Sequence, residues 1–88
     1  MKLKEGLVLR PLGGKYVAVA TGKLTSTFHG MIRLNETGAS MMNLLKEDTT
    51  KEEVINNLMK EYQADQTEIE KDVDTLLTNL KDNGLLDE

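Results

Sequence analysis

The residue types that most often carry catalysis are scarce in this chain and do not form a recognisable set. His29 is the single histidine and there is no cysteine, so neither a multi-histidine nor a thiolate metal site can be built. The acidic residues fall at expected helix starts and on outer helix faces, as solvated charges usually do. No GxxxxGK[ST] phosphate loop or dinucleotide-binding glycine pattern occurs. We therefore expect no catalysis, no metal and no cofactor.

Length and hydropathy favour one small domain, residues 1–88. No apolar run approaches the roughly 18 residues of a membrane span. The first residues lack the basic-then-apolar order of a signal peptide, so a cytoplasmic protein without a membrane partner is expected.

Charge is divided unequally along the chain. Residues 1–35 contain six basic side chains and one acidic side chain, whereas residues 36–88 contain five basic and fourteen acidic ones. The first segment is therefore net +5 and the second net −9. Segregation of this kind carries more information about partners than the total of −4 does.

The first third of the sequence has the pattern of a small β-sheet. Apolar or alternating runs at 7–10 and 16–20 flank a glycine-containing turn at 11–14. A polar loop at 22–28 and a third short strand at 29–34 follow. Three strands need one covered face to be stable, so helices must pack on this sheet.

The remainder is predicted to be helical. Asn35 is expected to cap a helix over 36–46, Thr50 and Glu53 have the spacing of a reciprocal capping box, and Asp65 opens a second candidate box. The third helix carries an apolar stripe and should end at Asn83-Gly84, after which Leu85-Leu86 fold back onto the core. Three strands followed by three helices predict an α+β domain of winged helix-turn-helix type.

A winged-helix architecture raises the possibility of DNA binding, but the charges oppose it. The expected recognition helix carries five acidic residues against Lys71 and Lys81, a net charge of −3 beside a phosphate backbone. We expect no nucleic-acid partner. A third possibility is peptide binding, because the strand at 29–34 should lie at a sheet edge that an extended peptide could complete.

The junction between this strand and the first helix resembles a known family. GMIRLNETGA at 30–39 is similar to the strand-to-helix junction of PqqD-like proteins, also described as RiPP recognition elements. Gly38 stands where many relatives have alanine, which should weaken the helix. The similarity continues in order and spacing over most of residues 5–86 through Leu44-Leu45, Asp48-Thr49-Thr50, Val54-Ile55, Leu58, Glu61-Tyr62, Asp72-Val73, Leu76-Leu77, Leu80 and Gly84-Leu85-Leu86.

The resemblance implies a non-catalytic peptide chaperone. Such proteins bind the leader of a ribosomally made precursor as an added β-strand and present it to a modifying enzyme, very often a radical S-adenosylmethionine maturase. Nothing in the sequence assigns this copy to quinone cofactor synthesis. A winged-helix DNA-binding regulator or a general interaction module is the alternative, and the exposed edge is compatible with a monomer or a weak homodimer.

Carried over by position, the resemblance places the peptide between the third strand and the third helix. We chose the helix flank that contains Asp72, Thr75 and Asn79 over the flank with Glu70, Asp74 and Lys81. Arg33 is expected to pair with an acidic leader residue and to set the register. The predicted peptide-binding residues are Phe28, His29, Gly30, Met31, Ile32, Arg33, Leu34, Asp72, Thr75, Leu76 and Asn79.

Overall fold

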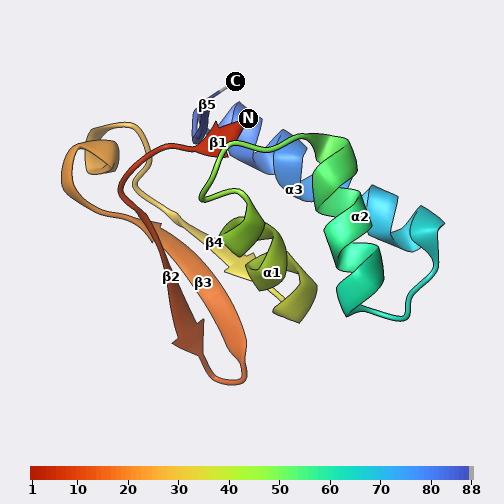
Figure 1. The fold of residues 1–88 in the computed structure, drawn as a ribbon. Helices are drawn as coiled ribbons and strands as arrows, with labels where there is room; N and C mark the ends of the chain where they lie inside the picture. The colour runs from red at the N-terminus through yellow and green to blue at the C-terminus, as the bar shows by residue number, and fades with distance from the viewer. Residues whose placement is uncertain (88) are drawn as a thin grey trace.

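The computed structural model describes residues 1–87 and contains a small sheet followed by three helices (Figure 1). In chain order the elements are β1 (Lys2–Leu3), β2 (Leu7–Leu12), β3 (Lys15–Ala20), the 3₁₀ helix η1 (Gly22–Ser26), β4 (Met31–Leu34), α1 (Glu36–Leu44), α2 (Lys51–Glu61), α3 (Gln66–Asp82) and β5 (Leu86–Asp87). The predicted α+β architecture, three antiparallel strands and then three helices, is confirmed.

The main sheet has the strand order β2-β3-β4, with both pairs antiparallel. Gly13 and Gly14 form the two-residue turn between β2 and β3, and both have positive φ, as a type I′ hairpin requires. The strands are longer than the apolar runs indicated, since Pro11 and Leu12 belong to β2 rather than to the turn. The outer position of β2 accommodates Pro11, which has no N–H to donate.

The third strand joins the first helix without a loop. Exposure alternates along β4, with Ile32 and Leu34 buried and Met31 and Arg33 exposed. Asn35 follows directly in an extended conformation, and its Oδ1 accepts a hydrogen bond of 2.8 Å from the backbone N–H of Gly38. One residue therefore ends the strand and caps the helix, as predicted.

The other two helix starts differ from the prediction. Thr50 does accept from the N–H of Glu53 at 3.2 Å, but the Glu53 carboxylate binds the Thr49 hydroxyl at 2.9 Å instead of reaching back to Thr50. The reciprocal box is therefore only half formed. Asp65 occupies the N-cap position of α3 and makes no side-chain cap bond, so that predicted box is wrong.

Several boundaries also shift. The first helix ends at Leu44 rather than at residue 46, and the polar segment 22–28 contains η1, in which Leu24 is buried. His29 and Gly30 precede β4 instead of belonging to it. Gly84 has φ of +69°, as expected for the residue after a helix.

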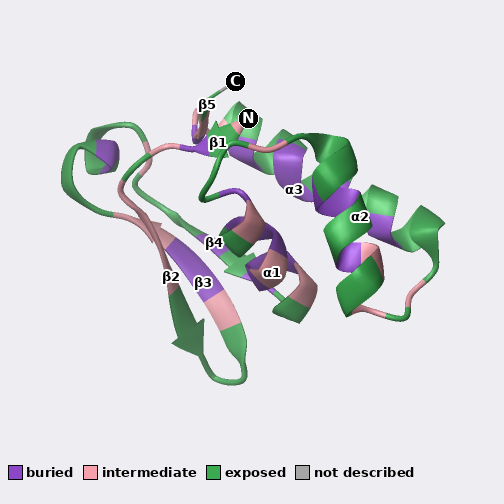
Figure 2. Ribbon diagram, in the orientation of Figure 1, coloured by how far each residue is buried: buried purple, intermediate pink, exposed green. Residues whose placement is uncertain are grey.

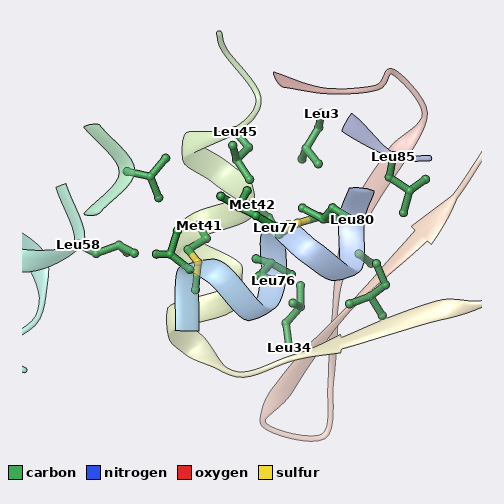
Figure 3. Packing of buried hydrophobic residues seen from close by; sticks show 14 of the residues in the cluster. Leu3, Leu34, Met41, Met42, Leu45, Leu58, Leu76, Leu77, Leu80 and Leu85 are labelled. Carbon is green, nitrogen blue, oxygen red and sulfur yellow. The ribbon is translucent and has the colours of Figure 1, made fainter. Parts of the chain in front are cut away.

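The core lies between the helices and one face of the main sheet (Figures 2 and 3). Ala18, Ile32 and Leu34 supply its sheet side. Tyr62 ties α1 to the end of α2, since its hydroxyl is 2.7 Å from that of Ser40. Leu45, directly after α1, belongs to the core cluster together with the helix residues Met41, Met42, Val54, Leu58, Ile69, Val73, Leu76, Leu77 and Leu80.

A second, two-stranded sheet joins the ends of the described chain. β1 pairs antiparallel with β5, which places Leu3 opposite Leu86. Leu85, fully buried, folds back onto the core as predicted, and its carbonyl accepts from the N–H of Lys4 at 2.9 Å. The Met1 ammonium group donates to Asp48 at 2.8 Å, and this hydrogen bond lowers the pKa of the Asp48 carboxyl.

Candidate functional site

A groove runs between the end of the main sheet and α3. It encloses about 230 Å³ and is bounded by β4, the first turns of α1 and the middle of α3. The residues that line it are Ile32, Arg33, Leu34, Asn35, Gly38, Met41, Asp72, Thr75, Leu76 and Asn79. Seven of the eleven residues predicted to bind peptide therefore meet around one cavity, although β4 and α3 are far apart in sequence.

The floor of the groove is apolar and its upper walls are polar. Ile32, Leu34 and Leu76 are each at most 7% exposed and form the floor. Leu34 of β4 and Leu76 of α3 lie near each other in Figure 3. Asp72 is exposed on the α3 side of the groove, and Arg33 is exposed on β4. An apolar floor with a few polar groups above it is typical of a ligand-binding surface.

The helix wall follows from the spacing along α3. Residues 72, 75, 76 and 79 recur at i, i+3, i+4 and i+7, so they share one face of a helix. The opposite flank is engaged elsewhere: Asp74 forms an ion pair with Lys51 of α2, and Glu70 accepts from Gln66 at 3.1 Å. The geometry thus turns the chosen flank toward β4.

The polar groups of this wall keep capacity for a ligand. The Thr75 hydroxyl donates to the Lys71 carbonyl at 2.9 Å and retains its acceptor lone pairs. The Asn79 side-chain oxygen accepts from Asn83 at 2.8 Å, which leaves the Asn79 amide as a donor. Within residues 1–87, neither Arg33 nor Asp72 makes an ion pair. Each could therefore bind an opposite charge without breaking an existing salt bridge.

Three groove residues were missed as site residues by the sequence reasoning. Asn35 was predicted to cap the first helix, and neither Gly38 nor Met41 was among the predicted peptide-binding residues, yet all three line the groove. They are spaced by three along the start of α1, so they share the helix face that adjoins β4. That spacing was a usable signal, because a helix that follows a strand directly must keep its first turns beside the strand.

Gly38 sets the closeness of α1 to β4. A Cβ atom at this position would lie 3.0 Å from Leu34 Cδ2, 3.2 Å from Leu34 Cβ and 3.3 Å from Asn35 Oδ1. The space between α1 and β4 at position 38 is therefore too small for a side chain unless Leu34 or Asn35 shifts. Gly30 is different, because its φ is not positive and a Cβ would meet only the Phe28 ring, at 3.5 Å. No conformational requirement for glycine is evident at Gly30.

The four remaining predicted residues surround a second hollow. Phe28, His29, Gly30 and Met31 border a hollow of about 460 Å³ before and at the start of β4, together with Val19, Ala20 and Thr25. Phe28 is half-buried against the core, and His29 is exposed. The predicted edge residues are therefore divided between two neighbouring hollows.

An unpaired sheet edge, that of β4, borders the groove. β4 pairs with β3 on one side only, because the strand order ends at β4. Every second N–H and C=O along such an edge has no strand partner. Among residues 1–87 no cluster of three metal-ligating side chains and no membrane-spanning helix occurs. An open edge beside an apolar groove is the arrangement found in domains that recognise extended peptides by strand addition.

Comparison with known proteins identifies the family. The sequence model of the family described as coenzyme PQQ synthesis protein D (PqqD) matches residues 5–86, and the chain belongs to this family. A search of the curated proteins gives no match.

Two similar solved structures share the fold. The first is described as TbiB1 in complex with the TbiA(beta) leader peptide; it has a TM-score of 0.72 at 24% identity, over 99% of this chain and 95% of that one. The second is described as lasso peptide synthetase B1 complexed with the leader peptide, with a TM-score of 0.67 at 25% identity, over 96% of this chain and 93% of that one.

Proposed function

We propose that this domain binds the leader segment of a ribosomally synthesised precursor peptide as a fourth strand on β4 and presents it to a modifying enzyme. The observation that carries the proposal is the unpaired edge of β4 along the groove. Membership of the PqqD family, and the two similar structures described with leader peptides, support it. The domain would contribute recognition, while catalysis would belong to its partner.

A peptide added to β4 would alternate between two environments. Residues beside Ile32 and Leu34 would point into the groove, toward Leu76 and the polar groups of α3. Residues beside Met31 and Arg33 would point the other way, onto the far face of the sheet. Leader recognition would therefore follow a period of two. The segment Phe28 to Gly30 would border the peptide where it passes the start of β4.

Charge would fix the register of the bound peptide. Arg33 would face an acidic leader residue directly opposite on the added strand, while Asp72 would favour a basic or hydrogen-bond-donating residue on the groove side. The edge residues and α3 belong to segments of opposite net charge, so a leader of mixed charge is the fitting ligand.

The modifying enzyme is proposed to be a radical S-adenosylmethionine protein, as the family resemblance implies. Its precursor substrate is made on ribosomes, so we place this activity in the cytoplasm. Neither assignment alters the peptide-binding mechanism, which depends only on the groove and the edge.

Backbone methylation of a bound peptide tests strand addition. Peptides would be selected from a random library displayed on phage, together with the leader of any precursor encoded beside the gene, and their affinities measured by calorimetry. A strand on β4 donates alternate N–H groups to the edge. Single N-methylation should then weaken binding by about tenfold or more at every second position, roughly 1.4 kcal/mol. The intervening positions should change little.

Two outcomes would contradict the proposal. One is an N-methylation profile without a period of two, and the other is failure of both peptide sources to bind. The DNA-binding alternative would instead give affinity for duplex DNA that falls steeply as salt rises. The exposed acidic residues of α3 oppose that result.

A further inference from the structure

The sheet has a second face that no core residue covers. Val8, Leu12, Val19 and Met31 lie outside the hydrophobic core, and so does Val17, although only 7% of its surface is exposed. The residues between them along β2, β3 and β4, such as Leu9, Ala18 and Ile32, pack against the core. We call the side formed by Val8, Arg10, Leu12, Val17, Val19, Met31 and Arg33 the outer face.

Strand register arranges six of these residues in two rows, and Leu12 lies beyond them, opposite Lys15. Val8, Val19 and Met31 are cross-strand neighbours, and so are Arg10, Val17 and Arg33. The two arginines flank Val17, at two strand spacings or about 10 Å from each other. Val17 is buried without helix cover, which is consistent with the aliphatic stems of both arginines lying over it. An apolar row thus lies next to a row with cationic ends.

This face has no acidic counterpart of its own. Residues 6–35 contain no Asp or Glu, and within residues 1–87 neither Arg10 nor Arg33 forms an ion pair. Leu12 and Met31 are also the exposed large hydrophobic residues of the described chain, at 57% and 54%. Methionine and arginine are enriched in the centres of protein interfaces. The combination favours a protein partner over nucleic acid.

We propose that the outer face binds the modifying enzyme. The matching surface of the enzyme would have an apolar centre surrounded by acidic residues. The inference rests on the proposed function, because β4 belongs both to this face and to the edge where the peptide would add. A fourth strand on β4 would extend the outer face sideways. An enzyme seated there would contact the outward-pointing residues of the leader and receive the segment that follows it.

A substitution at Arg10 tests enzyme docking without disturbing peptide binding, because Arg10 lies on β2, two strands away from the open edge. Arg10→Glu should weaken binding to the modifying enzyme encoded beside the gene by at least about tenfold in low salt. It should leave leader affinity unchanged within about twofold, and Leu12→Ala should weaken docking several-fold. Lys60→Glu, an equal charge change on the exposed side of α2, is the matched control and should bind as the wild type does. Circular dichroism would verify that each variant folds.

Three results would overturn this docking surface. Arg10→Glu and Lys60→Glu could bind the enzyme equally well. Sedimentation could show that a second copy of the chain covers the face, with a wild-type dimer that Arg10→Glu dissociates. Arg10→Glu could instead abolish salt-sensitive binding of duplex DNA. Failure of the wild type to bind any leader would contradict the proposed function. That result is distinguishable from failure of docking, because enzyme docking is measured without the peptide.

Discussion

At the residue scale, the groove combines side chains with different duties. The Asn35 Oδ1 atom caps α1, and a Cβ atom at position 38 would lie close to this same oxygen. Asn35 and Gly38 both line the cavity. Structural and binding roles therefore coincide around the junction. Arg33 is simpler to test, since its exposed side chain lies on the edge strand and makes no ion pair within residues 1–87.

Arg33→Glu should weaken leader binding by about 5- to 30-fold. Replacing an attractive cross-strand charge pair with a repulsive one changes the binding free energy by about 1–2 kcal/mol. Calorimetry with the selected peptides measures the change, and a charge-reversed peptide should restore affinity to Arg33→Glu. Equal affinities of Arg33→Glu and the wild type would contradict the register-setting role.

At the element scale, the direct passage from β4 into α1 places a helix beside the sheet edge without a loop. This passage was predictable, because both the alternation of β4 and the capping preference of asparagine are local signals. The absent bond at Asp65 was not predictable, since cap geometry depends on how the preceding chain enters the helix. The flank of α3 that meets β4 likewise depends on tertiary packing, although the spacing restricted the choice to two.

Two of the three predicted caps, Asn35 and Asp65, give a matched pair of substitutions. Asn35→Ala removes a cap acceptor at 2.8 Å and should lower the free energy of unfolding by about 0.5–2 kcal/mol. Asp65→Ala removes no cap bond and should cost only the few tenths of a kcal/mol expected from a charge near a helix N-terminus. Urea unfolding followed by circular dichroism compares the two, and an equal loss in both variants would contradict the assignment of the caps.

At the scale of the whole molecule, the small sheet β1-β5 joins segments more than eighty residues apart. Two-residue strands carry no periodic pattern, so this pairing could not be predicted, whereas the return of Leu85 to the core could. The β1-β5 sheet matters for the site because β5 follows α3, one wall of the groove, after only three residues. Its rigidity should help to hold that wall against β4.

Leu85→Ala tests how much of the stability depends on the return of the chain to the core after α3. Leu85 is fully buried, and its replacement should cost about 2–5 kcal/mol through lost transfer energy and the resulting cavity. A chain of this size has only about 4–13 kcal/mol of stability, so the midpoint of thermal unfolding should fall by at least about 8 °C. Leu86→Ala, the adjacent half-buried position in β5, is the control and should cost clearly less. An equal loss in Leu86→Ala and Leu85→Ala would contradict the larger contribution expected from the fully buried Leu85 side chain.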